Sequence, residues 1–224
     1  DELHLDIEDI EGGDGGLAGY LNAPEGSFPN VQRVHLNEFG WGRTSYTVGG
    51  REAGQFVRQF PRLEHVTIRG CRDWPEGMGD DLPWTQLKTL ELGGVDALSS
   101  PFPLGIRGMT QLTQFQLPNG GFVPEWIGEL TQLTTLQIAA SNTPALLKGV
   151  TKLQRLTSLD LSFSDLSQLP GDIGSMTALA DLNLSWCDHL TALPPSIAEL
   201  TRLTRLGVYA TLRAKVFFAG FVYS

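Results

Sequence analysis

Four side chains close to the N-terminus are of the types that bind transition metals. They are the imidazoles of His4, His35 and His65 and the carboxylate of Asp6. Nitrogen and oxygen ligands form a zinc site when three or four of them converge on one point. His35 and His65 are far from His4 and Asp6 in the sequence, so only neighbouring structural elements could bring all four together. We expect separate solvent-facing side chains instead, and we assign neither a metal nor a cofactor.

Three aromatic residues near the other end are suited to a different task. Phe163, Trp186 and Tyr209 recur at near-constant intervals. Aromatic side chains dominate the binding hot spots of protein interfaces, so three aromatics along one edge would form an anchor for a partner. The alternative is that they pack on one another and on the C-terminal tail.

Catalytic motifs are weak. The stretch "GGDGGLAG" at 12–19 contains a GxGxxA string. Acidic residues surround it and would repel a pyrophosphate, and no βαβ pattern frames it. No serine or cysteine has a recognisable general base. The sequence therefore predicts no catalytic residue, and we expect this chain not to be an enzyme.

A repeated pattern supplies the elements that would position all of these residues. From Leu63 onward, L-x-x-L-x-L recurs at intervals of 21 to 25 residues, a period typical of leucine-rich repeats. A partial unit opens the chain, because Leu3 and Leu5 occupy its second and third apolar places. The later units begin at Val31, Leu63, Leu87, Leu112, Leu133, Leu156, Leu179 and Leu203.

Each unit predicts a short strand followed by a short return. The last three positions of L-x-x-L-x-L alternate, so their leucines share one face of a strand. In "LPPSIAEL" at 193–200, proline starts a turn, and Ile197 and Leu200 have the spacing of one helical turn. One unit cannot bury its leucines alone, so stacked units share a core. We predict an α/β fold over residues 1–209: a right-handed leucine-rich repeat solenoid with a parallel β ladder on the concave face and short helical or 3₁₀ returns on the convex face.

The eighth residue after the first leucine of a unit is expected to be buried and to hydrogen-bond the backbone of the bend. Cys71, Ser141, Ser164 and Cys187 occupy this position. The two cysteines are five units apart, about 24 Å, which is beyond the reach of a disulfide. We expect two free, buried thiols with structural roles.

The stretch "LPGDIGSMTALADLNLSWCDHLTALPPSIAELTRLTRL" at 169–206 resembles plant-type leucine-rich repeats. Such repeats occur in cytosolic plant proteins and in type III effectors of plant-pathogenic bacteria, and this stretch is most similar to the repeat domain of the Xanthomonas XopL/XopAE group. The resemblance covers roughly residues 31–209. It implies a target-binding module whose family carries ubiquitin-ligase activity on a separate C-terminal domain, which nothing in these 224 residues matches.

Side chains between the strand leucines should face the concave side, where another protein would bind. The residues expected to contact that partner are Arg33, His35, His65, Arg69, Glu91, Gln114, Gln116, Gln137, Asp160, Phe163, Asp181, Trp186, Arg205 and Tyr209.

Composition limits the class of partner. The chain has a formal net charge of −9 and 41% apolar residues. Phosphate binding requires a cationic surface, so we expect no nucleic-acid partner. No run of about 18 apolar residues is present, and the acidic N-terminus does not resemble a signal peptide. We expect a soluble monomer in a reducing compartment, without a membrane partner.

Both ends depart from the regular repeat. The two N-terminal units are long and glycine-rich, and residues 210–224, "ATLRAKVFFAGFVYS", form an apolar C-terminal tail or cap. We expect the tail to fold back over the open end of the solenoid. The alternatives are association with another molecule through the tail, and truncation or altered reading of a longer gene.

Two functions fit this sequence. The first is the target-binding repeat domain of a bacterial effector, secreted by a type III system into the cytoplasm of plant cells. The second is the regulatory scaffold of a cytosolic leucine-rich repeat signalling protein. Flanking sequence would distinguish them, because a secretion region before residue 1 and a ligase domain after residue 224 would favour the effector.

Overall fold

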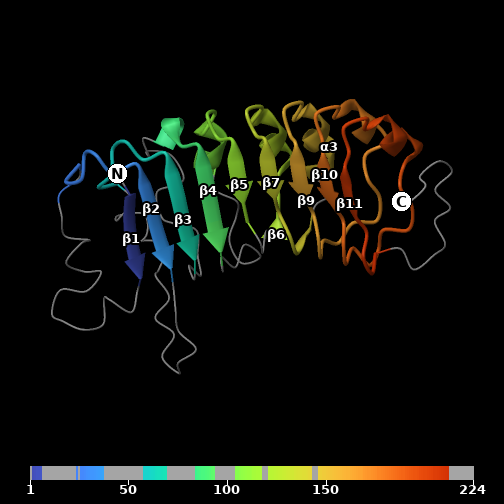
Figure 1. Cartoon of the computed structure of the whole chain (residues 1–224), viewed down its shortest axis with the longest axis horizontal. Helices are drawn as coiled ribbons and strands as arrows, with labels where there is room; N and C mark the ends of the chain where they lie inside the picture. Colours follow the sequence, from blue (N-terminus) through green and yellow to red (C-terminus); the bar gives the residue numbers. More distant parts are fainter. Residues whose placement is uncertain are drawn as a thin grey trace, which may run out of the picture.

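Short parallel strands form one continuous sheet. The computed structural model describes residues 2–6, 24, 26–37, 58–69, 84–93, 104–117, 121–142 and 146–211. Within them the sheet has nine strands in the order β1-β2-β3-β4-β5-β7-β9-β10-β11 (Figure 1). The strands are β1 (Glu2–Asp6), β2 (Arg33–Asn37), β3 (His65–Arg69), β4 (Thr89–Gly93), β5 (Gln114–Gln116), β7 (Thr135–Gln137), β9 (Ser158–Asp160), β10 (Asp181–Asn183) and β11 (Arg205–Gly207).

The predicted register of the repeats is confirmed. Every strand of this sheet from β2 onward begins two residues after the first apolar residue of its unit. The partial first unit is also present, because Leu3 and Leu5 of β1 lie opposite Val34 and Leu36 of β2. The leucine pattern alone therefore places the strands.

Leucines of successive units stack behind the sheet and form the core. Leu159, Leu182 and Leu206 lie opposite one another on β9, β10 and β11. Leu161 and Leu184, which follow β9 and β10, are fully buried. The core runs along the solenoid because each unit buries its leucines against the next.

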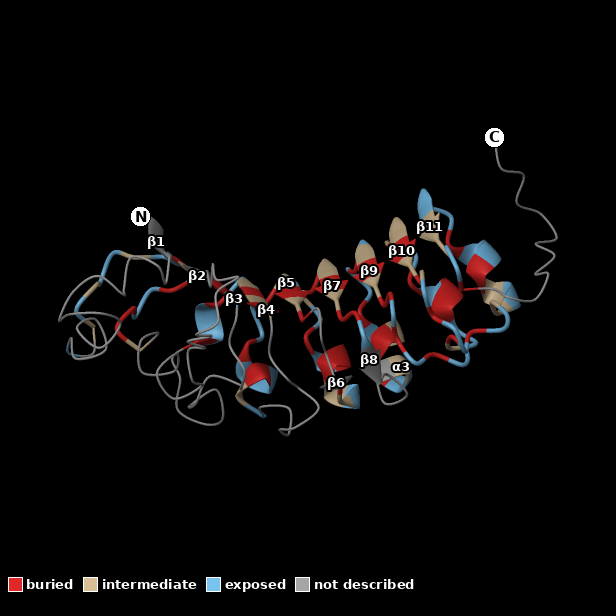
Figure 2. Cartoon of the chain, turned by 90° about the horizontal axis from the view of Figure 1, so that it is seen from below, coloured by how far each residue is buried: buried red, intermediate tan, exposed pale blue. Residues whose placement is uncertain are grey.

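Short helical segments return the chain behind the sheet, as predicted. They are η2 (Trp84–Gln86), η3 (Leu104–Gly108), η4 (Glu125–Glu129), α3 (Leu146–Gly149), η5 (Val150–Lys152), η6 (Ile173–Ser175) and η7 (Pro195–Glu199). Figure 2 shows returns and strands on opposite sides of the buried layer. In η7 the extended Pro194 precedes Pro195, and the buried Ile197 accepts a hydrogen bond from the Leu200 N–H at 3.2 Å.

Glycines allow neighbouring returns to approach closely. A Cβ added to Gly128 would lie 2.2 Å from the carbonyl oxygen of Gly149, and one added to Gly174 would lie 2.4 Å from that of Ser196. The equivalent residue of the last return, Ala198, is exposed. A side chain is therefore excluded only where another described unit packs against the return.

A second, two-stranded sheet was not predicted. Gly121–Phe122 (β6) pairs in parallel with Ser141–Asn142 (β8). Two-residue strands carry too few positions for an alternating pattern, so the sequence gives no signal for them.

The last unit extends beyond the predicted boundary at residue 209. Thr211 is fully buried, and its Oγ1 donates to the carbonyl oxygen of Leu184 and accepts from the Cys187 N–H at 3.3 Å. Thr211 is the eighth residue after Leu203, so it occupies the same bend position as Ser164 and Cys187. The repeat domain therefore includes residues 210 and 211, which were assigned to the tail.

Several expectations concern residues outside the described ones. These are the two long glycine-rich stretches, Cys71 and residues 212–224 of the tail. None of the helices in the described ranges is long and apolar enough to cross a bilayer.

Candidate functional site

A left-handed bend follows the strands at the C-terminal end of the sheet. Ala140, Phe163, Trp186 and Ala210, each the seventh residue after the start of its unit, have φ of 51°, 59°, 62° and 55°. This conformation costs a residue with a side chain about 1–2 kcal/mol. The bends are linked, because the Phe163 N–H donates to the Ser185 carbonyl at 2.9 Å and the Trp186 N–H donates to the Tyr209 carbonyl at 2.8 Å. Two large aromatics thus occupy a backbone position that favours glycine.

In the last three bends the next residue, Ser164, Cys187 or Thr211, is buried and bonds the preceding unit. Ser164 Oγ lies 3.4 Å from the carbonyl oxygen of Ile138, and Cys187 Sγ lies 3.2 Å from that of Leu161. Burial raises the pKa of the Cys187 thiol, which lowers the fraction of reactive thiolate. Cys187 is therefore the free, buried thiol with a structural role that the repeat position predicts.

The three aromatics form one exposed stack. The Phe163 and Trp186 rings are nearly parallel, with centroids 5.8 Å apart and an interplanar angle of 6°. Tyr209 meets Trp186 edge-on, with centroids 5.4 Å apart. The exposed fractions of Phe163, Trp186 and Tyr209 are 59%, 45% and 72%. Stacking thus leaves a contiguous aromatic surface in water, which we call the aromatic edge.

A polar groove of about 630 Å³ lies on the sheet between β7 and β11. Asp160 Oδ1 accepts the Ser162 N–H at 2.9 Å, and Asn183 Oδ1 accepts the Ser185 N–H at 3.1 Å. Arg205 Nη2 donates to the Asp181 carboxylate on the neighbouring strand. The residues that line the groove are Thr135, Leu136, Gln137, Ser158, Leu159, Asp160, Asp181, Asn183, Thr204, Arg205, Leu206 and Gly207.

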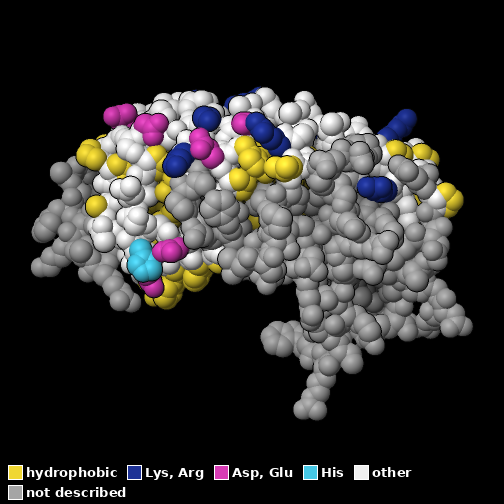
Figure 3. Space-filling view, turned by 180° about the vertical axis from the view of Figure 1, so that it is seen from behind, with side chains coloured by type: hydrophobic (Ala, Val, Ile, Leu, Met, Phe, Trp, Pro, Cys, Tyr) yellow, Lys and Arg dark blue, Asp and Glu magenta, His cyan; other side chains and the backbone are white. Residues whose placement is uncertain are grey.

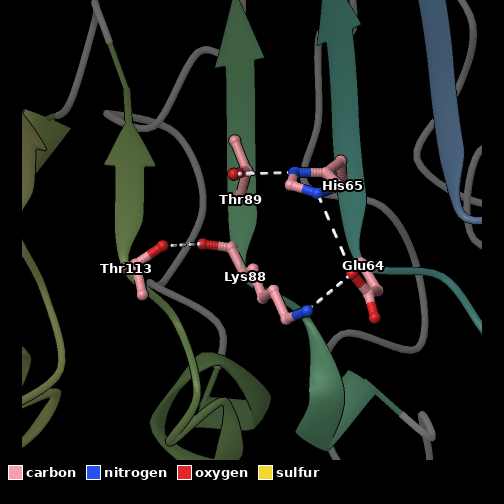
Figure 4. Close-up of polar contacts among 5 residues, drawn as sticks. All are labelled: Glu64, His65, Lys88, Thr89 and Thr113. Atoms are coloured by element: carbon pink, nitrogen blue, oxygen red, sulfur yellow. Dashed lines mark hydrogen bonds and ion pairs between the residues drawn. The ribbon is translucent and has the colours of Figure 1, made fainter.

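A second polar group lies around β3 and β4 (Figure 4). His65 Nδ1 is 3.0 Å from Thr89 Oγ1, and Lys88 Nζ donates to the Glu64 carboxylate at 2.7 Å. That hydrogen bond is the main cause of the lowered pKa of Glu64. Burial is the main cause of the lowered pKa of His65, and the positive charge of Arg33 lowers it further.

The strands align the histidines, but no metal site forms among the described residues. His4 lies opposite His35 in the β1–β2 register, and His65 lies opposite Arg33. Among the residues that the structure describes, no three potential ligands come together. The side chains of His4 and Asp6 lie outside the described ones.

Every residue predicted to contact a partner is at least partly exposed. Around β3, Arg69 pairs with Glu91 at 2.7 Å. Gln116 and Gln137 face each other on β5 and β7 in the middle of the sheet. The predicted residues therefore lie along the ladder, and the aromatic edge joins only those of its C-terminal third.

Sequence reasoning missed two residues that shape this region. Ala140 holds the same bend position as Phe163 and Trp186, and counting seven residues from Leu133 would have identified it. Asn183 supports the bend before Trp186 through its side chain. The sequence signal for this role is an Asn whose side chain accepts a hydrogen bond from the N–H two residues later, a spacing typical of side-chain-capped turns.

Charges on the other side of the molecule are paired between returns. Arg107 Nε lies 2.7 Å from the Glu129 carboxylate, and Lys152 Nζ lies 3.9 Å from that of Glu125. Figure 3 shows basic and acidic side chains close together along this side. Such a mixed surface offers no continuous cationic track among the described residues.

A parallel ladder of short strands, 3₁₀ returns and a buried hydrogen-bonding side chain at the bends define this chain as a leucine-rich repeat solenoid. No family model and no curated protein matches the sequence. A leucine-rich repeat protein of Leptospira interrogans superposes with a TM-score of 0.55 and 26% identity, over 78% of this chain and 41% of that chain.

Two further solved structures share the fold. The plant peptide hormone receptor RGFR1 in complex with RGF2 has a TM-score of 0.59 and 20% identity, over 84% of this chain and 30% of that chain. The internalin InlF of Listeria monocytogenes has a TM-score of 0.50 and 16% identity, over 79% and 54%. This chain spans less than two thirds of the length of each of these three proteins.

Proposed function

We propose that this chain is a non-catalytic protein-binding module, which holds its partner against the concave groove and the aromatic edge. The observation that carries the proposal is the exposed stack of Phe163, Trp186 and Tyr209 beside a polar groove. Isolated exposed apolar residues are ordinary. A contiguous apolar patch with a polar rim is typical of interaction sites.

The fold supports the same function. Solenoids present extended concave surfaces to their partners. RGFR1, a peptide hormone receptor, was solved in complex with RGF2. The groove of this chain runs over several strands, so it suits an extended segment of a partner protein.

The finer proposal is that the partner is a plant protein and that this chain is the target-binding part of a type III effector acting in the host cytoplasm. Its support is the similarity of residues 169–206 to the XopL/XopAE repeats. The second candidate, a regulatory scaffold of a cytosolic signalling protein, is favoured by the same plant-type repeats.

Capture experiments test the binding surface. The immobilised parent chain, the double variant Gln116→Arg/Gln137→Arg and the control Arg107→Gln would be exposed to plant leaf extract and to bacterial lysate. We expect a plant protein to be retained by the parent and the control and lost by the double variant, because two cations then project from the middle of the sheet. Equal retention by all three proteins would reject binding through the concave face. A specific partner found only in the bacterial lysate would reject a plant target.

A further inference from the structure

Among the described residues, no aromatic side chain covers the second face of the Phe163 ring. Trp186 covers one side of the Phe163 ring. In the preceding unit the equivalent residue is the exposed Ala140, whose bend has the same geometry: a left-handed φ and an N–H that donates to the Ser162 carbonyl at 2.9 Å. Neighbouring units are about 4.8 Å apart. The space over Ala140 is therefore one repeat wide, and a flat group placed there would continue the stack.

The bend of Phe163 also holds a carboxylate that has no cationic partner among the described residues. Asp160 ends β9, and its Oδ1 accepts the N–H of Ser162, the residue directly before Phe163. Its register neighbours are the neutral Gln137 and Asn183. No cation of the described ranges pairs with Asp160, whereas the neighbouring Asp181 is paired with Arg205.

We propose that Asp160 and the open face of Phe163 form a docking site for an arginine side chain of the protein partner. A guanidinium is planar, stacks on aromatic rings and donates two parallel hydrogen bonds to a carboxylate. Lysine, a compact point charge, satisfies the carboxylate without filling the flat space. The Arg205–Asp181 pair shows that this sheet already accommodates an arginine–aspartate hydrogen bond one strand away.

The net charge favours a basic segment as the source of this arginine. The chain carries a formal charge of −9, so it attracts cationic segments and repels a second copy of itself. This inference rests on the proposed protein-binding function and specifies the chemistry of the bound partner.

A small probe tests the site without the unidentified partner. N-acetyl-L-arginine amide would be titrated into the ¹⁵N-labelled chain, with N-acetyl-L-lysine amide as the matched probe. We expect chemical-shift changes concentrated at the amides of Ala140 and Phe163 and at the Trp186 indole N–H. The arginine probe should bind at least about threefold more tightly than the lysine probe, because only the guanidinium both stacks on the ring and donates two parallel hydrogen bonds to the carboxylate.

Three variants locate the binding energy. Asp160→Asn keeps an Oδ1 acceptor for the Ser162 N–H but removes the charge, and Phe163→Leu keeps an apolar side chain but removes the flat face. Each should weaken arginine binding about fivefold or more, since each removes one of the two contacts. Asp165→Asn removes an equally negative but more exposed group, paired with His189 at 2.7 Å, and should leave the affinity unchanged.

Two results would overturn the arginine site. One is a set of shifts spread over the acidic surface, with equal affinity for both probes. The other is an equal loss in Asp165→Asn and Asp160→Asn. If the concave-face variants lose the captured protein while the arginine probe shows no localised binding, the arginine site is wrong and the protein-binding function stands.

Discussion

Trp186 combines backbone strain with exposure. It holds a left-handed φ of 62° although it is large, and its ring lies between Phe163 and Tyr209 in water. Strained residues of this kind persist when the surrounding structure determines them, and they cluster at functional sites. Ala140 and Ala210 adopt the same bend without an aromatic ring. The aromatic side chains at Phe163 and Trp186 are therefore not required to form the bend.

Two substitutions at this position separate binding from stability. Trp186→Ala and Trp186→Gly both remove the stacking contacts, and each should weaken partner binding by about 2 kcal/mol or more. The glycine variant should be more stable than the alanine variant by about 1 kcal/mol, because glycine adopts the left-handed conformation without steric cost. Calorimetric titration and urea unfolding would measure both effects. Parent-like affinity in both variants would remove Trp186 from the interface.

His65 should titrate below the ordinary histidine pKa of 6.5, because burial and Arg33 both disfavour its charged form. The unfolded chain then binds a proton that the folded chain does not, between the lowered pKa and 6.5. The contribution of His65 to stability is therefore complete above pH 6.5 and is lost as the pH falls through this window. Replacing Arg33 with Gln should raise the pKa towards 6.5 without reaching it, since burial remains the larger cause.

An NMR titration of the His65 ring would measure this pKa, and Arg62→Gln, which changes another exposed arginine, is the control. A pKa at or above 6.5 in the parent chain would contradict the proposed causes.

At the scale of the elements, the distance between returns is set by glycine. Replacing Gly128 with Ala would place a methyl group against the backbone of the next return, where a Cβ has only 2.2 Å of room. Overpacking of this kind costs about 1–3 kcal/mol. Gly108→Ala is the matched control, because nothing lies within 4 Å of the added Cβ. Urea unfolding should show the loss in Gly128→Ala alone, and equal stability of the two variants would mean that the returns can separate freely.

The strands were predictable because their leucines alternate, and the returns because proline and the Ile197–Leu200 spacing recur. The pattern describes which residues must be buried, and burial places these elements. It is silent about contacts made by exposed side chains. Neither the parallel stacking of Phe163 on Trp186 nor the Asp160 hydrogen bond leaves a periodic signal, so the aromatic edge could be suspected from sequence but its geometry could not.

At the scale of the whole molecule, the C-terminal end of the solenoid is less well covered than its middle. Leu203, Leu206 and Val208 are only partly buried, whereas Leu179, Leu182 and Leu184 of the preceding unit are fully buried. Solenoids need a terminal cap, since the last unit otherwise exposes its core. The apolar segment that follows Thr211 is suited to that role by composition.

Deleting residues 212–224 should therefore lower both the melting temperature and the solubility of the chain. Thr211 is kept in this variant, because its hydroxyl belongs to the last bend. Phe217→Ser/Phe218→Ser preserves the length of the tail and should produce a smaller loss in the same direction. Thermal unfolding and size-exclusion chromatography would measure these effects. A shortened chain that is as stable, monomeric and soluble as the parent would show that the tail is not a cap.

The left-handed bend residue has an evolutionary consequence. It recurs once in each of the last four units. At Phe163 and Trp186 the side chain is exposed and stacks on aromatic residues of neighbouring units. Replacing Ala140 or Ala210 with an aromatic residue would lengthen the row or fill the open space beside Phe163, and no buried leucine would have to change. Duplicated genes with this architecture could therefore diverge in the partners they recognise through single codon changes, while inheriting the same folding core.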